Sequence, residues 1–280
     1  MCGIAGIISS NNNHISNLNK LEKMIFDINY RGPDDRGLWT EKNNRVYLAH
    51  ARLSILDLSK NGKQPMVSEN GRFIITYNGE IYNHLDLRKE IENENRVKWN
   101  SYSDTETLLK LIEIYGIKKS LKKLKGMFAF SCYDKKLNLL FLCRDKFGEK
   151  PLYYGLVDGE FYFSSDLKSI ILNNNNLELD YEAINNFLMY SYIPSPQSIL
   201  KDVHKLEAGF FLELDIKKFS KGDNKFYALS NWFYLNSEIL QSKKKVVKDY
   251  KSCLNLIENK IFKSVESQLI SDVPVGCFLS

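Results

Sequence analysis

The chain has 280 residues, 44% of them hydrophobic and 26% charged, and its formal net charge is +5. This composition is that of a globular protein and excludes intrinsic disorder and fibrous folds. The apolar runs from Ile4 to Ile8 and from Leu137 to Cys143 are far shorter than the roughly 18 residues of a membrane span, and the N-terminus has no signal-peptide pattern. We therefore expect a cytoplasmic protein with no membrane partner.

The charges, cysteines and histidines exclude several other classes of partner. The basic side chains are scattered, and the run Lys243-Lys244-Lys245 is better explained by a solvated helix end than by a nucleic-acid contact. The five cysteines form no CxxC pair, and the four histidines have no metal-ligand spacing. We predict no nucleic-acid partner, no disulfide framework and no metal.

In the first half of the chain, predicted strands and helices follow one another. Apolar residues at spacings of three and four predict helices, and short β-prone runs predict strands. Ser103 stands before one of these helices with Glu106 three residues later, which is the sequence of a capping box. The predicted strands are 3–9, 45–51 and 72–77, and the predicted helices are 18–28, 85–91 and 105–115.

The second half begins with strand-like runs separated by turn signals, which predict an antiparallel meander. Its predicted strands are 127–133, 137–143, 152–156 and 161–165. A helix at 181–190 and a strand at 210–214 complete an α+β pattern. The polar segment 216–245 is typical of a linker, and a long amphipathic helix at 247–269 leads into an apolar, strand-like end at 276–280. We therefore divide the chain into 2–215, 216–245 and 246–280.

Cys2 is the first candidate catalytic residue. Its side chain is small enough to permit removal of Met1, and Cys2 would then begin the chain. An N-terminal cysteine carries a nucleophile and a potential base on one residue, because a free α-amine has a pKa of roughly 7.7–8.0. Any protonated amine would also favour the thiolate. The alternative is that a cysteine at this position has no role.

Asn78 and Gly79 are a candidate oxyanion hole. They follow the predicted strand at 72–77, so an amide side chain and a glycine N–H would lie together just beyond a strand end. Glycine leaves the backbone open to close approach by a substrate carbonyl. The alternative is an ordinary Asn-Gly hairpin turn.

Arg52 and Asp104 are candidate ligands for the charged groups of an amino acid. A guanidinium binds an α-carboxylate through two donors, although Arg52 could instead form an internal ion pair with Asp57 or Glu80. Asp104, at a predicted helix start, could accept from a substrate ammonium group. It could equally complement the helix dipole.

Eight segments in order resemble the glutaminase half of the glutamine-hydrolysing asparagine synthetases, which are class II glutamine amidotransferases with an N-terminal nucleophile fold. The resemblance covers essentially all of residues 2–215, and it implies a four-layer αββα sandwich. The residues that follow, Asp272 to Ser280, resemble the start of that family's α/β ATP-pyrophosphatase-like domain. The eight segments are Cys2 to Gly6, Arg31 to Asp34, Ala51 to Ile55, Gly62 to Met66, Asn78 to Asn83, Ser103 to Glu106, Gly126 to Phe130 and Arg144 to Tyr154.

The resemblance also implies roles for individual residues. Cys2 would be the nucleophile, with its own α-amine as the base, and Asn78 and Gly79 would form the oxyanion hole. Leu279 would lie against ATP. The glutamine head group would be held by Arg52, Glu80 and Asp104.

The activity that the resemblance implies is that of an asparagine synthase (glutamine-hydrolysing). Glutamine would be hydrolysed to glutamate and ammonia, and the longer protein would use the ammonia for ATP-dependent amidation of aspartate. The glutaminase half would need no cofactor, whereas ATP and Mg would serve the missing half, and a homodimer is expected. Alternatives are an amidotransferase for another acceptor, such as a surface-polysaccharide sugar acid, and a non-catalytic assembly module.

Overall fold

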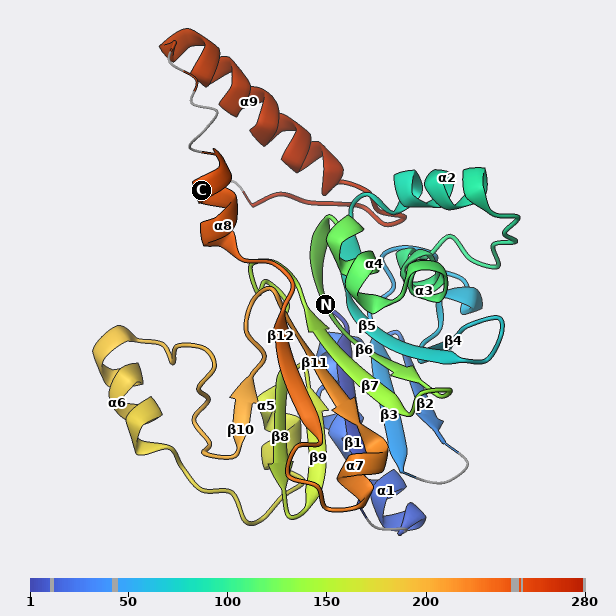
Figure 1. The fold of residues 1–280 in the computed structure, drawn as a ribbon, viewed down its shortest axis with the longest axis vertical. Coiled ribbons are helices and arrows are strands. Elements are labelled where there is room, and N and C mark those ends of the chain that lie inside the picture. The colour runs from blue at the N-terminus through green and yellow to red at the C-terminus, as the bar shows by residue number, and fades with distance from the viewer. Residues whose placement is uncertain (11–12, 42–44, 243–246, 248, 279–280) are drawn as a thin grey trace.

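Two antiparallel six-stranded sheets stacked face to face form the centre of the computed structural model, which describes residues 1–10, 13–41, 45–242, 247 and 249–278 (Figure 1). Sheet A has the strand order β10-β8-β9-β1-β3-β2, and sheet B has the order β12-β11-β7-β6-β5-β4. The strands of sheet A are β1 (Gly3–Ile8), β2 (Asp35–Thr40), β3 (Val46–Arg52), β8 (Tyr153–Val157), β9 (Glu160–Ser164) and β10 (Val203–Lys205). Those of sheet B are β4 (Met66–Val67), β5 (Phe73–Ile81), β6 (Gly126–Asp134), β7 (Leu139–Arg144), β11 (Phe210–Asp215) and β12 (Tyr227–Asn231).

Helices cover the outer face of each sheet, so the layers run helix, sheet, sheet, helix. Helices α1 (His14–Asp27) and α5 (Leu167–Ile171) pack on sheet A, and α2 (His84–Glu94), α3 (Asp104–Tyr115) and α4 (Ile117–Lys123) pack on sheet B. The predicted mixed α+β fold is confirmed. The remaining helices are α6 (Tyr181–Tyr190), α7 (Ile216–Ser220), α8 (Leu235–Ser242) and α9 (Tyr250–Ser267), and the short 3₁₀ turns are Asn29–Arg31 and Lys60–Gly62.

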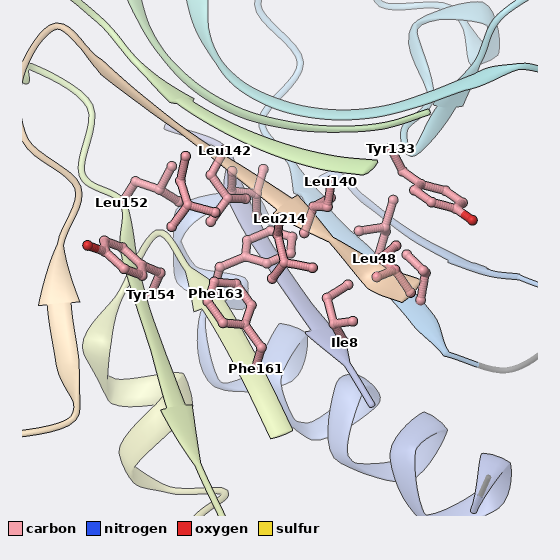
Figure 2. Close-up of a cluster of buried hydrophobic side chains, with 14 of the residues drawn as sticks. Ile8, Leu48, Tyr133, Leu140, Leu142, Leu152, Tyr154, Phe161, Phe163 and Leu214 are labelled. Atoms are coloured by element: carbon pink, nitrogen blue, oxygen red, sulfur yellow. The ribbon is translucent and has the colours of Figure 1, made fainter. Parts of the chain in front are cut away.

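The main core lies between the two sheets. Figure 2 shows Leu48 and Phe163 of sheet A meeting Leu142 and Leu214 of sheet B. Burial of each such side chain contributes about 1.5–3 kcal/mol, so these contacts hold the two sheets together.

The alternation of side chains along β5 decides which of its residues can face the other sheet. Ile74 belongs to the core between the sheets, whereas Tyr77 and Ile81 pack under the helices. Because successive side chains of a strand point to opposite faces, Asn78 and Glu80 point toward sheet A with Ile74. Strand β5 continues through Asn78 and Gly79 to Ile81, so the alternative of an Asn-Gly hairpin turn is wrong, as is their placement beyond a strand end.

The predicted meander from 127 to 165 is divided between the two sheets. Strands β6 and β7 pair in sheet B, and β8 and β9 pair in sheet A. The chain crosses over after Asp145, a fully buried carboxylate that accepts hydrogen bonds from the amides of Phe128, Phe147, Glu149 and Lys150 at 3.0–3.2 Å. These bonds fix the crossing, which local strand signals do not reveal.

The segment 216–245, predicted as a linker, contains regular structure in both halves, because α8 follows α7 and β12 within it. It contains α7 and β12, and β12 pairs antiparallel with β11 from Leu214↔Tyr227 to Phe210↔Asn231. The sheet therefore extends to Asn231. The lysine run 243–245 lies outside the described residues.

The C-terminal part differs most from its prediction. Helix α9 forms, but its apolar side chains are exposed, with Ile261 at 59%, and the helix projects away from the sheets (Figure 1). Residues 276–278 form no strand, so the predicted buried strand is wrong for the described part of 276–280. An ATP-pyrophosphatase-like α/β domain is not present among the residues that the structure describes. None of the described helices has both the length and the apolar character needed to cross a membrane.

Candidate active site

All six residues predicted to act on glutamine lie at one end of the space between the sheets. Cys2 immediately precedes β1, and Arg52 ends the neighbouring strand β3. The sheet B residues face them from the last part of β5, and Asp104 begins α3. A cavity of about 130 Å³ is lined by Cys2, Arg52, Asn78, Gly79, Glu80 and Asp104.

A larger cavity, of about 930 Å³, lies at the opposite end of the sandwich. It is lined by Val46, at the other end of β3 from Arg52, and by basic residues such as Lys135 and Lys217. It contains no cysteine and none of the predicted site residues. The smaller cavity is the candidate active site because a nucleophile, an amide donor and opposite charges converge there.

The position of Cys2 is fixed from both sides. Its thiol lies 3.6 Å from the carbonyl oxygen of Leu53, and the amide of Leu53 lies 3.4 Å from the sulfur. The Nε of Arg31 donates to the Cys2 carbonyl at 3.1 Å. The thiol is therefore held against the end of β3, beside Arg52.

The electrostatics of the terminus favour neutral groups. Burial raises the pKa of the Cys2 thiol, and this effect outweighs the opposing effects of the Leu53 backbone and the terminal amine. The expected bias toward thiolate concerns the freed α-amine of Cys2, and it stays a prediction because the terminal amine here belongs to Met1. Burial likewise lowers the pKa of the α-amine, which in this chain belongs to Met1. Both shifts favour the uncharged forms of thiol and amine, and the uncharged amine is the form that can act as a general base.

Asn78 presents an unused donor at the cavity. Its side chain is 1% exposed, and its Nδ2 has no hydrogen-bond partner among the residues that the structure describes. A buried amide without a partner is unfavourable by about 1–3 kcal/mol, so its presence at a cavity suggests a ligand acceptor.

Gly79 is required by packing as well as by access to substrate. A Cβ at Gly79 would overlap the carbonyl oxygen of Met127 and approach Cα of Phe128 to 2.7 Å on the adjacent strand β6. Any larger side chain would push β5 away from β6 and displace the neighbouring Asn78.

Arg52 is held by backbone carbonyls. Its guanidinium donates to the carbonyl oxygen of Ser59 at 2.9 Å and to that of Asp57. No ion pair joins it to a carboxylate among the described residues, so the alternative of an internal ion pair with Asp57 or Glu80 is wrong. Arg52 thus lines the cavity without an ion-pair partner among the described residues, so its charge can bind a carboxylate.

Asp104 and Glu80 are the acidic residues that line the cavity. The Oδ2 of Asp104 accepts from the Tyr77 hydroxyl at 2.7 Å and from the Ile81 amide at 2.9 Å, and this carboxyl is buried. Burial raises the pKa of Asp104 despite these bonds. Burial also raises the pKa of Glu80, while the charge of Lys150 opposes the shift.

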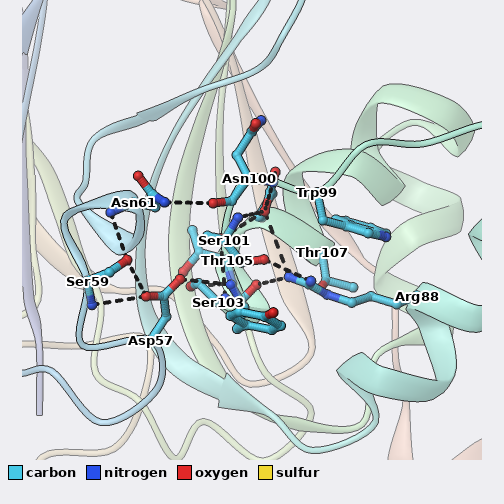
Figure 3. Close-up of polar contacts among 12 residues, drawn as sticks. Asp57, Ser59, Asn61, Arg88, Trp99, Asn100, Ser101, Ser103, Thr105 and Thr107 are labelled. Carbon is cyan, nitrogen blue, oxygen red and sulfur yellow. Dashed lines mark hydrogen bonds and ion pairs between the residues drawn. The ribbon is translucent and has the colours of Figure 1, made fainter.

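Ser103 caps α3 but does not form the predicted capping box. Its side chain accepts from the Thr105 amide at 3.1 Å. Glu106 turns away to accept from Ser101 and Asn100 at 2.8–3.2 Å, because those amides lie on the loop before the helix (Figure 3). The prediction of the N-cap is confirmed, and the prediction of the reciprocal bond from Glu106 is wrong.

Sequence reasoning missed several polar residues of the cavity, and Gln64 and Lys150 are two of them. Gln64 accepts from the Tyr77 amide at 2.6 Å and donates to Thr105 Oγ1 at 3.2 Å, which ties β5 to α3 behind Asp104. Lys150 is buried at the cavity wall, and burial lowers its pKa. Both lie inside segments that carried the family resemblance, but their roles depend on tertiary contacts. Leu279, the predicted ATP contact, lies outside the described residues.

A family model described as a glutamine amidotransferase domain matches residues 1–227. The whole chain is 38% identical to the putative asparagine synthetase (glutamine-hydrolyzing) 2 of Methanocaldococcus jannaschii and 35% identical to the asparagine synthetase (glutamine-hydrolyzing) 1 of Bacillus subtilis. These alignments cover 54% and 42% of the two relatives. The chain therefore spans about half the length of the curated relatives it matches.

The fold has a counterpart among solved structures. The glutamine phosphoribosylpyrophosphate amidotransferase of B. subtilis, in complex with ADP and GMP, matches with a TM-score of 0.59 at 18% identity. The match covers 82% of this chain and 49% of that one. At this level of identity the similarity concerns the fold alone.

Proposed function

Because the chain belongs to the glutamine amidotransferase domain family, we propose that it hydrolyses the side-chain amide of glutamine to glutamate and ammonia. What carries this proposal is the convergence, at one cavity, of the Cys2 thiol, the unpartnered amide of Asn78 and the charges of Arg52 and Asp104. The order of events follows from the chemistry of these groups.

The head group of glutamine sets its orientation. The α-carboxylate pairs with Arg52, and the α-ammonium group pairs with Asp104 and Glu80. The side-chain amide then points toward Cys2. Held in this way, the thiol and the amide carbon react as one bound complex, which removes much of the entropic barrier of a bimolecular step.

The thiol of Cys2 attacks the amide carbon while the α-amine of the processed terminus accepts its proton. The carbonyl oxygen becomes an oxyanion that the Nδ2 of Asn78 and the N–H of Gly79 stabilise. The protonated amine then gives its proton to the departing nitrogen, and ammonia leaves. Water attacks the resulting thioester by the reverse sequence and releases glutamate.

The test is ammonia release from glutamine by Cys2→Ala. We expect no measurable release, whereas Cys277→Ala should retain the wild-type rate because Cys277 is exposed on the C-terminal segment. Release by Cys2→Ala at the wild-type rate would remove the nucleophile from the proposal. Mass spectrometry should show that the active chains lack Met1, and activity from chains that keep it would contradict the role of the α-amine.

In a longer protein of the kind that the relatives represent, we propose that the ammonia amidates aspartate to asparagine. The names of those relatives favour aspartate over a sugar-acid acceptor, and the intact set of cavity residues argues against a non-catalytic module. ATP and Mg would serve that synthetase step. The homodimer and the cytoplasmic location stay predictions. An assay of the longer protein with aspartate, ATP and Mg tests the acceptor, and glutamine hydrolysis without asparagine formation would contradict it.

A further inference from the structure

The peptide that follows α9 is hydrogen-bonded to a loop of the candidate active site. The Asp272 carboxylate accepts from the Asp57 amide at 2.7 Å, and the Asp272 amide donates to the Ile55 carbonyl at 3.0 Å. These residues are more than 200 positions apart in the sequence. Ile55 and its neighbour Leu56 line the same cavity as Cys2. The C-terminal segment is thus attached to the back of a cavity wall.

Asp57 follows the cavity-lining residues Ile55 and Leu56 and receives several of the contacts that hold this loop. Its φ of +54° lies in the left-handed region, which is unfavourable for most residues other than glycine and is found at functional sites where contacts hold it. Its side chain accepts from the Ser59 amide at 3.0 Å and from the Tyr102 amide at 2.8 Å (Figure 3). Its amide is the group that Asp272 binds. Each of these bonds restrains the same strained residue.

Arg52 depends on that residue for its position. Its guanidinium donates to the carbonyls of Asp57 and Ser59, so a change in the backbone at Asp57 would move the guanidinium. Asp272 therefore acts at one end of a continuous set of contacts, and Arg52 stands at the other end, in the cavity. The backbone of Asp57 links the two side chains, because its amide binds Asp272 and its carbonyl binds Arg52.

We propose that residues 271–273 form a strap that positions Arg52 for the α-carboxylate of glutamine, with Asp272 as a positioning residue. The inference rests on the proposed glutamine hydrolysis. It adds that glutamine binding and docking of residues 271–273 are coupled. Docking of the strap favours the binding geometry of Arg52, and glutamine binding must favour docking of the strap to the same degree. The segment after α9 and the glutamine cavity are thereby linked.

Steady-state kinetics of three variants test the strap. Asp272→Ala should raise the KM for glutamine about fivefold and leave kcat within about twofold, because it loosens binding without touching the reacting atoms. Asp272→Asn, which keeps an acceptor oxygen, should stay within about twofold of the wild-type KM. The matched control is Asp249→Ala, since Asp249 makes a similar 2.7 Å bond to the Ser252 amide but caps α9 away from the loop. It should leave KM unchanged.

An unchanged KM in Asp272→Ala would overturn the strap while leaving the glutaminase proposal intact. A fall in kcat at unchanged KM would also overturn it. An equal rise in KM for Asp249→Ala would show a general effect of loosening the C-terminal part, and it too would refute a specific role for Asp272.

Hydrogen exchange supplies a measurement that does not depend on the folding of these variants. In Cys2→Ala, saturating glutamine should slow exchange in peptides that cover 53–59 and in peptides that cover 270–275. Slowing of the first region alone would overturn the coupling. If neither region responds, glutamine does not bind, and the proposed function fails together with the strap.

Discussion

Replacing Asn78 with alanine should separate catalysis from stability. The Nδ2 of Asn78 is buried at the cavity without a partner among the described residues, so in the free protein this amide lowers the stability of the fold. Loss of one oxyanion donor typically lowers kcat by roughly 100- to 1000-fold, which corresponds to about 2.7–4 kcal/mol of transition-state stabilisation. We expect that loss in Asn78→Ala, with a nearly unchanged KM.

The effect on the free energy of unfolding should be small. Removing an unpaired buried amide relieves about 1–3 kcal/mol of desolvation cost, and the space left by the shorter side chain offsets a similar amount. Unfolding in urea should therefore place Asn78→Ala within about 1 kcal/mol of the wild type.

Thr76 provides the matched control on the same face of β5. Its hydroxyl is buried and bonded to the Ser131 hydroxyl at 2.6 Å. Thr76→Val should lose about 1–3 kcal/mol of stability, because it leaves the buried Ser131 hydroxyl unpaired, and its kcat should be close to that of the wild type. If Asn78→Ala instead lost as much stability as Thr76→Val and kept the wild-type kcat, Asn78 would be a structural residue and our reasoning would be wrong.

Two further predictions concern the Arg52 pocket and the response to acid. A Cβ at Gly62 would overlap the Arg52 guanidinium, so Gly62→Ala should raise the KM for glutamine roughly tenfold with kcat largely kept; an unchanged KM would show that Arg52 can move without loss. Burial lowers the pKa of His50 and of His84 from 6.5 to about 4, so the stability linked to the neutral rings is complete above about pH 6.5 and declines toward pH 4, by up to about 3 kcal/mol for each ring. When the pH is lowered from 7 to 5, the free energy of unfolding measured in urea should fall less for His84→Leu than for the wild type. An equal fall in both proteins would show that His84 does not cause this pH dependence.

The strands that the sequence pattern predicted are those with continuous apolar runs. Strand β1 is buried on both faces, with Ile4 toward sheet B and Ile7 toward α1, so its run of apolar residues was a sufficient signal. The short strands β4 and β10 and the exposed strand β12 carry no such run, because pairing with a neighbour and not burial of two faces decides their conformation.

The sequence predicted those parts of the candidate site that depend on the type and order of single residues. Residue chemistry made Cys2, Asn78 and Arg52 candidates, the resemblance assigned their roles, and the structure places them at one cavity. Asp57 and Asp272 could not be found in this way, because their importance comes from a bond between residues far apart in the chain. A local pattern contains no information about such a contact.

The strict alternation along β5 makes its length a condition of activity. Deleting one residue between Phe73 and Tyr77 would turn the rest of the strand over, so that the amide of Asn78 faced the helical layer and the Tyr77 ring faced sheet A. The apolar side chains of β5 that follow the deletion would change layers by the same step. Changes in chain length can therefore be tolerated in surface connections such as 221–225, but not within this strand.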